Sequence, residues 1–212
     1  MLSFHPIIKT IFMYTYLALG DSYTIGEQVP AEGNFPHQTV QQLAAMGMAV
    51  TPPVIVATTG WTTDELATAI REHNITGTYS FVSLLIGVNN QYRGRSVDNY
   101  RMEFTTLLLQ AIQFAGGKPD RVFVLSIPDW GVTPFAEGRD RAQIATEIDA
   151  YNAACRDITL AHGCHFTSIT ESTRANGTNP QYLAPDGLHP SADEYAIWAG
   201  RLATKVKATL GH

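Results

Sequence analysis

Thr15-Tyr16-Leu17-Ala18-Leu19-Gly20-Asp21-Ser22-Tyr23 joins an apolar run of strand length to a short polar loop that contains glycine. Similar apolar runs recur along the chain, and segments with helical periodicity separate them. The runs are rich in Val, Ile, Leu, Phe and Tyr, which suits strands of a parallel sheet that is buried on both faces. This alternation is typical of βαβ units and predicts an α/β fold.

The positions of the predicted elements follow from these runs. Strands are expected at residues 15–19, 54–57, 79–86, 121–127 and 165–168. Long helices are expected at residues 36–48, 63–74, 97–115, 140–162 and 192–210. Two helix starts have the spacing of a capping box, in which a hydroxyl and a carboxylate satisfy backbone amides that the helix leaves free. These pairs are Thr62 with Glu65 and Ser191 with Glu194.

Length and composition describe a packed globular protein. The chain has 212 residues, of which 45% are hydrophobic and 16% are charged. Because the usual charged fraction is about 25%, these values exclude a disordered, collagen-like or coiled-coil chain. We expect an N-terminal arm over residues 1–13 and a single domain over residues 14–212.

Charge, cysteine content and hydropathy exclude several other classes. Fourteen Lys and Arg residues against nineteen Asp and Glu residues give a net charge of −5 without a long basic run, so we expect no nucleic-acid partner. Cys155 and Cys164 are too few for a disulfide scaffold and are expected to be free core residues. No apolar run reaches the roughly 18 to 20 residues of a membrane span. Lys9 interrupts the N-terminal apolar run and no cleavage site follows it, which predicts a cytoplasmic protein.

Polar residues gather in the loops that follow the predicted strands and precede the last helix. Reactive groups of open α/β sheets lie in such loops, because helix N-termini and exposed amides converge there. Each motif alone is more often a turn or a helix cap than a catalytic group, but their joint placement favours a shared site. The four loops are Gly20-Asp21-Ser22-Tyr23, Thr59-Gly60-Trp61, Gly87-Val88-Asn89-Asn90 and Asp186-Gly187-Leu188-His189-Pro190.

These blocks, in this order, resemble the SGNH, or GDSL-like, hydrolase family, which is named after a serine, a glycine, an asparagine and a histidine in four separate blocks. The resemblance extends over about residues 14–210. It implies a three-layer α/β/α domain around a five-stranded parallel sheet with flavodoxin-like strand order. Ser22 matches the nucleophile, Gly60 the glycine, Asn89 the asparagine, and Asp186 with His189 the Asp-x-x-His of the last block.

The resemblance also implies the chemistry of these residues. His189 would take the proton of the Ser22 hydroxyl as it attacks an acyl carbon, and Asp186 would orient the imidazole. The resemblance implies three donors for the oxyanion: the Ser22 amide, the Gly60 amide and the Asn89 side chain. This chemistry requires neither a metal nor an organic cofactor, so we expect no cofactor.

Two positions depart from the family pattern. Tyr23 replaces the leucine of Gly-Asp-Ser-Leu, and Asn90 replaces the aspartate of Gly-x-Asn-Asp. Since Asn90 places an amide where the family has a carboxylate, we expect any divergence in the positioning of Asn89. Asp21 is expected to fix its loop as a hydrogen-bond acceptor, and Asp129 is a reserve candidate for an acid partner or a pocket residue.

The expected activity is hydrolysis of a small-molecule acyl ester. The resemblance implies a carboxylesterase, lysophospholipase, thioesterase or carbohydrate deacetylase. Gln91, Tyr92 and Arg93 favour a short acyl chain on a polar alcohol, whereas a lysophospholipase or thioesterase would act on longer chains. A binding module for acyl groups or glycans, without turnover, and a nucleotide-binding flavodoxin-like protein are the alternatives from other classes.

Other motifs count against competing chemistry. No G-x-S-x-G elbow occurs, which argues against an α/β-hydrolase, and no glycine-rich phosphate-binding motif occurs. One cluster of possible zinc ligands spans the end of a predicted helix and the start of a strand, so its side chains should diverge. We therefore expect no metal site there. The cluster consists of Cys155, His162, Cys164 and His165.

Overall fold

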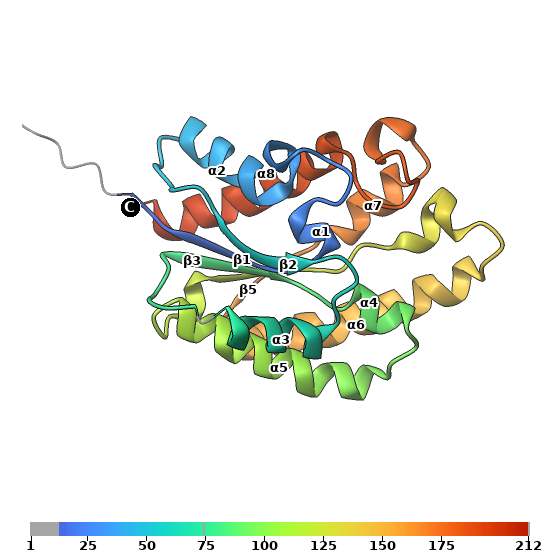
Figure 1. The fold of residues 1–212 in the computed structure, drawn as a ribbon, viewed down its shortest axis with the longest axis horizontal. Coiled ribbons are helices and arrows are strands. Elements are labelled where there is room, and N and C mark those ends of the chain that lie inside the picture. Colours follow the sequence, from blue (N-terminus) through green and yellow to red (C-terminus); the bar gives the residue numbers. More distant parts are fainter. Residues whose placement is uncertain (1–12, 74, 212) are drawn as a thin grey trace, which may run out of the picture.

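A parallel sheet forms the middle layer of the protein (Figure 1). The computed structural model describes residues 13–73 and 75–211, so the arm predicted over residues 1–13 lies outside the described residues except for Met13. The sheet has five strands in the order β2-β1-β3-β4-β5, which confirms the predicted fold and its flavodoxin-like order. The strands are β1 (Tyr16–Asp21), β2 (Val54–Thr58), β3 (Phe81–Leu85), β4 (Val122–Leu125) and β5 (His165–Thr167).

Helices cover both faces of this sheet (Figure 1). One face carries α1 (Ser22–Ile25), α2 (Phe35–Ala45) and α8 (Ala192–Leu210). The opposite face carries α3 (Thr63–Glu72), α5 (Val97–Phe114) and α6 (Arg141–Ala161). The connections contain the short helices α4 (Val88–Tyr92) and α7 (Thr170–Asn176) and the 3-10 helices η1 (Ala31–Gly33), η2 (Pro119–Arg121), η3 (Trp130–Val132), η4 (Pro134–Ala136) and η5 (Pro180–Tyr182).

The five predicted strands and the five long helices are confirmed, with shifts of a few residues at their ends. The start of α2 illustrates the cause, because the Asn34 side chain accepts a hydrogen bond from the His37 amide and caps the helix before Phe35. The three short helices were not predicted. Each is too short to show an apolar period, so its residues look like loop in the sequence.

One of the two predicted capping boxes is present. Thr62 and Glu65 form the reciprocal cap of α3, with 2.8 Å between the Thr62 amide and the Glu65 carboxylate. The second prediction is wrong in part: Ser191 does cap α8, accepting from the Asp193 amide, but the Glu194 carboxylate does not reach back to the Ser191 amide. Glu194 is buried and accepts instead from Asn176 in α7 and from Trp198, one turn further along α8, which compete successfully with the local cap.

The core lies on both faces of the sheet. Every residue of β1, β3 and β4 is buried, as expected for strands covered by helices on two sides. Cys155 and Cys164 are free and buried, as predicted. Within residues 13–73 and 75–211, no helix combines the length and the apolar character needed to cross a membrane.

Strand order determines where a site can form. The chain leaves β1 for β2 on one side and then returns to β3 on the other side of β1. A crevice opens at such a switch point, outside the carboxyl ends of the strands. The ends of β1, β2 and β3 are the places where three of the four polar loops begin.

Candidate active site

The structure brings the predicted site residues together at this edge of the sheet. Ser22 begins α1 directly after β1, Gly60 follows β2, and Asn89 lies in α4 after β3. All three line one pocket with His189, which precedes α8. Asp186 stands behind His189 and hydrogen-bonds to its ring.

The imidazole of His189 connects a carboxylate to a hydroxyl. Its Nδ1 lies 2.6 Å from Asp186 Oδ2, and its Nε2 lies 3.0 Å from Ser22 Oγ. An ionised carboxylate only accepts, so Nδ1 carries the proton and Nε2 is free to accept from the serine hydroxyl. Ser22 and His189 are both buried, which shields this contact from competing water.

Consecutive residues build the support of His189. Asp186 Oδ1 accepts hydrogen bonds from the backbone amides of Leu188 and His189, at 2.9 and 3.0 Å. Gly187 has a φ of 66°, a left-handed conformation that favours glycine. Burial raises the pKa of the Asp186 carboxyl, but hydrogen bonds from the His189 ring and the two amides outweigh burial and leave that pKa below its usual value. Asp186 is therefore an anion at neutral pH.

The opposite side of the pocket depends on contacts between distant residues. Asn89 Nδ2 donates to the Trp61 carbonyl at 3.0 Å and to Asp21 Oδ2 at 3.4 Å. Gly60 has a φ of 84°, and its carbonyl accepts from the Arg93 guanidinium at 2.6 Å. An amide nitrogen has only two protons, so Asn89 can reach a substrate oxygen only by releasing or sharing one bond. The longer bond to Asp21 is the weaker of the two.

Asn90 joins two of the loops that form this side. Its Oδ1 accepts from the Thr63 amide at 3.1 Å, and its Nδ2 donates to the Thr63 hydroxyl at 2.6 Å. The hydroxyl of Thr63 in turn donates to Glu103. Asn90 is fully buried. The amide that replaces the family's aspartate thus holds the start of α3 against α4, next to Asn89.

Asp21 fixes the loop that carries Ser22, as the sequence predicted. Its Oδ1 accepts from the Tyr23 amide at 3.0 Å and caps α1. Asp21 is fully buried, and burial raises the pKa of its carboxyl to about 7, although the Tyr23 amide and the Asn89 side chain favour the charged form. It supports both the nucleophile and the Asn89 side chain.

Aromatic side chains form one wall of the pocket. The rings of Trp130, Tyr92 and Phe135 pack against one another, with centroid distances of 5.3 Å from Trp130 to Tyr92, 6.0 Å from Trp130 to Phe135 and 6.4 Å from Tyr92 to Phe135. Trp130 Nε1 donates to Gln91, which fixes the indole. The pocket and its open mouth together hold about 530 Å³ of empty space. Its lining consists of Ser22, Tyr23, Thr59, Gly60, Val88, Asn89, Tyr92, Trp130, Phe135, Leu188 and His189.

The structure corrects the expectation for the polar residues after the third strand. Only Tyr92 lines the pocket. Gln91 is buried between Trp130 and Glu147, and Arg93 is bonded to the Gly60 carbonyl and Glu65. Gln91 therefore supports the aromatic wall, and Arg93 supports the Gly60 loop. Trp130 and Phe135 were not predicted to line the pocket, although both lie in the connection that follows β4, where the same loop rule points.

The remaining candidates lie outside the pocket. Asp129 is buried in a 2.8 Å ion pair with Arg174, and its Oδ1 accepts from the Gly131 amide, so its oxygens are directed to partners other than His189. Among the residues that the structure describes, no group of three His, Cys, Asp or Glu side chains is arranged to hold a metal ion. That part of the chain includes the Cys155 to His165 cluster.

A three-layer α/β/α fold with these four blocks at the carboxyl ends of its strands defines an SGNH-type hydrolase. The sequence model of the GDSL-like lipase/acylhydrolase family matches residues 18–197. The chain belongs to this family, and membership supports ester hydrolysis in general. No curated protein sequence matches the chain significantly.

Solved structures of esterases share the fold. The lipase/acylhydrolase from Enterococcus faecalis has a TM-score of 0.70 and 21% identity, over 92% of this chain and 96% of its own. The acetylxylan esterase Axe2 from Geobacillus stearothermophilus has a TM-score of 0.72 and 20% identity, over 92% and 95%. Esterase EstA from Pseudoalteromonas has a TM-score of 0.67 and 14% identity, over 94% and 100%. At such identities the similarity establishes the fold alone.

Proposed function

We propose that the protein hydrolyses carboxylic esters with short acyl chains through a covalent intermediate on Ser22. The observation that carries this proposal is the chain of contacts from Asp186 through His189 to Ser22, with 2.6 and 3.0 Å between the hydrogen-bonded atoms. A serine hydroxyl is a weak nucleophile at neutral pH unless a base lies within hydrogen-bond reach. His189 is such a base, and Asp186 fixes its tautomer.

In the first half of the reaction, Ser22 Oγ attacks the carbonyl carbon and His189 Nε2 takes the hydroxyl proton. The resulting imidazolium is stabilised by the Asp186 carboxylate. His189 then gives the proton to the alcohol oxygen as the bond between the acyl carbon and that oxygen breaks. The alcohol leaves, and the acyl group stays on Ser22.

The negative charge of the tetrahedral intermediate requires donors that are already in position. The proposed donors are the amides of Ser22 and Gly60 and the side chain of Asn89, which line the same pocket. Release of Asn89 from its long bond to Asp21 would make one N–H available. In the second half, water attacks the acyl carbon with His189 as the base, and Ser22 is regenerated as the acid leaves.

A short chain is the better fit for this pocket. Its apolar wall suits a hydrocarbon group, but Tyr23, Trp130 and Leu188 close the pocket on its inner side. Acetyl or butyryl groups would be accommodated, whereas octanoyl or longer chains would project into solvent and gain little from burial.

A sugar ester is a second candidate substrate. The rings of Tyr92 and Phe135 line the pocket and are also 47% and 45% exposed, so they present aromatic faces at its mouth. Such faces pack against the C–H surface of a sugar ring. Acetylated xylose should then be a better substrate than ethyl acetate, and Tyr92→Ala should reduce that preference.

The test is hydrolysis of p-nitrophenyl acetate, butyrate, octanoate and palmitate by the wild type and by Ser22→Ala. Ser168→Ala is a matched control, since Ser168 lies beyond β5 and outside the pocket. We expect turnover and fluorophosphonate labelling in the wild type and in Ser168→Ala, loss of both in Ser22→Ala, and a preference for acetate or butyrate. Circular dichroism confirms equal folding.

Each other outcome would assign a different function to the protein. A preference for octanoate or palmitate would favour a lysophospholipase or thioesterase. A folded wild type that neither hydrolyses an ester nor reacts with the fluorophosphonate would contradict the proposal and favour a binding module.

A further inference from the structure

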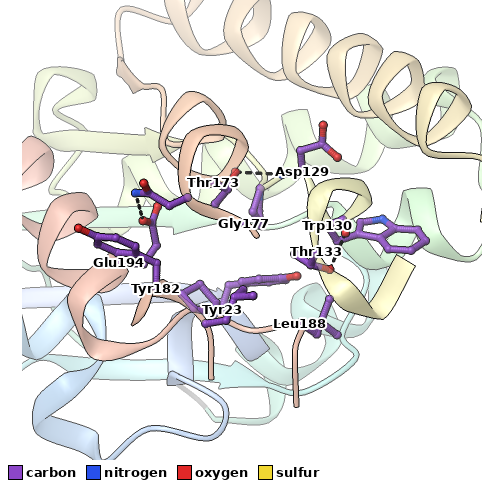
Figure 2. A pocket seen from close by; sticks show the side chains of 13 residues that line it. Tyr23, Asp129, Trp130, Thr133, Thr173, Gly177, Tyr182, Leu188 and Glu194 are labelled. Carbon is purple, nitrogen blue, oxygen red and sulfur yellow. Dashed lines mark hydrogen bonds between the residues drawn. The ribbon is translucent and has the colours of Figure 1, made fainter. Parts of the chain in front are cut away.

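A second, smaller chamber adjoins the active-site pocket. Its empty space, about 290 Å³ with the part that opens to solvent, is narrow, and Figure 2 shows Tyr23 on one side of it with Thr173 and Gly177 on the opposite side. Three side chains line both the chamber and the active-site pocket: Tyr23, Trp130 and Leu188. Because these residues face both spaces, they form the partition between them.

The chamber is suited to a hydrocarbon group. Two buried carboxylates line it, but both already have partners. Asp129 accepts from Arg174 and the Gly131 amide, and Figure 2 shows its carboxylate turned away from Tyr23. Glu194 accepts from Asn176 and Trp198 at 2.7 and 2.8 Å. Much of the remaining surface is apolar side chain, which favours an apolar occupant.

Tyr23 is held rigidly within this partition. Its side chain is only 3% exposed, and its ring centroid lies 5.1 Å from that of His189 and 6.3 Å from that of Trp198. A tightly packed ring cannot leave its rotamer without disturbing its neighbours. The tyrosine stands where the family motif has a leucine, a shorter side chain that would fill less of the space between the two cavities.

We propose that Tyr23 determines the length of the hydrocarbon chain that the enzyme accepts, by closing the active-site pocket against the chamber. This inference rests on the proposed esterase function and names a specificity-determining residue for it. With the tyrosine in place, a chain ends at the ring. With a smaller residue, pocket and chamber join into one deeper apolar space, and a longer chain is buried.

The variants Tyr23→Leu and Tyr23→Ala test this directly. The kcat/KM of each is measured on p-nitrophenyl esters from acetate to decanoate and on acetate esters of primary alcohols from methanol to octanol. The first series extends the acyl side of the ester and the second extends the alcohol side. The series whose optimum moves identifies the side that enters the chamber.

In each series, kcat/KM for a chain of six to eight carbons is divided by kcat/KM for a chain of two carbons. We expect this ratio to be at least tenfold higher in the variants than in the wild type, in one of the two series. Each methylene that becomes buried contributes about a fourfold gain, so a few of them are sufficient. Tyr23→Phe keeps the ring and should keep the wild-type length profile. A shift in Tyr23→Phe would assign the effect to the hydroxyl and overturn the inference.

Folded Tyr23→Leu and Tyr23→Ala proteins with the wild-type length profile in both series would also overturn it. If neither variant folds, Leu188→Ala opens the same partition from another side, and a wild-type profile there has the same consequence. A wild type that hydrolyses none of the esters removes the proposed function and this inference together. Ser22-dependent turnover with unchanged profiles removes the inference alone.

Discussion

The two sides of the reaction centre are built in different ways. The side that carries the base is one short loop, in which Asp186 holds the amides of Leu188 and His189 as well as the imidazole. The oxyanion side joins loops that are far apart in the chain, through the contacts of Arg93 with Gly60 and of Asn90 with Thr63. The proposed base is therefore positioned locally, and the proposed oxyanion donors are positioned by contacts between distant loops.

Because the two sides are positioned differently, substitutions on them should have different effects on activity and stability. A change in the local loop should remove chemistry and leave the rest of the protein intact. A change in the long-range network should alter stability and turnover together, because the same contacts hold the loops and aim the donors.

The largest effect is expected from removal of the base. His189→Ala should lower kcat by about 10⁴- to 10⁶-fold, because Ser22 then has no group to accept its proton. Steady-state kinetics on p-nitrophenyl acetate measure the loss. The melting temperature should change little, since the loop amides still bind Asp186. Retention of a tenth of the activity would exclude His189 as the base.

Loss of one oxyanion donor should have the next largest effect. Asn89→Ala should lower kcat by about 10²- to 10³-fold, which is roughly 3 to 4 kcal/mol of transition-state stabilisation. KM should change much less, because the donor acts on the charge that forms in the transition state. An Asn89→Ala variant with an unchanged kcat and a raised KM would instead assign Asn89 to substrate binding.

Asp21 should give the oxyanion side a dependence on pH. The pKa of Asp21 is about 7 in the folded protein and near its usual 3.8 in the unfolded chain, so the folded state binds more protons between these values. The unfolding free energy therefore falls as pH rises from about 4 to 7, by at most on the order of 4 kcal/mol. Above about pH 7 this group causes no further change.

Urea unfolding of the wild type and of Asp21→Asn at several pH values tests this. Subtracting the unfolding free energy of Asp21→Asn from that of the wild type cancels the contributions of the other titrating groups. The difference should fall as pH rises from about 4 to 7. A difference that does not vary with pH would show that the Asp21 pKa is unshifted.

The smallest effect is expected where this chain departs from its family. Asn90→Asp places a fully buried carboxylate beside Thr63, whose one hydroxyl proton already serves the partly exposed Glu103. We expect a loss of about 1 to 3 kcal/mol in unfolding free energy and less than a tenfold loss in kcat. Adding Glu103→Gln should recover part of both. Equal losses in the single and double variants would show that Glu103 and residue 90 are not coupled.

The parts of the fold that were predicted are those with local signals. Buried strands and long helices have characteristic periods, and the Asp186 to His189 spacing is contained within one loop. The short helices α1, α4 and α7 have no such period. The predicted capping box at Ser191 failed in part because Glu194 bonds to Asn176 of α7 as well as to Trp198 of its own helix, and local spacing does not encode the contact with α7.

The site shows the same division. Its four blocks indicated which residues would meet, but the roles of Gln91 and Arg93 as supports depend on where distant loops arrive. The contact between Trp130 and Gln91 joins loops that follow different strands, and neither residue has a sequence pattern that marks it. Packing decided these positions, so only the folded structure could assign them.

The order of the four blocks has a consequence for biosynthesis. A ribosome makes Ser22, Gly60 and Asn89 early and His189 late, 167 positions after Ser22. The base loop runs directly into α8, which docks on α2 through hydrogen bonds from Gln38 and Gln42. An emerging chain thus holds Ser22 without its proposed base. The site can be completed only when α8 has packed against α2 on that face of the sheet.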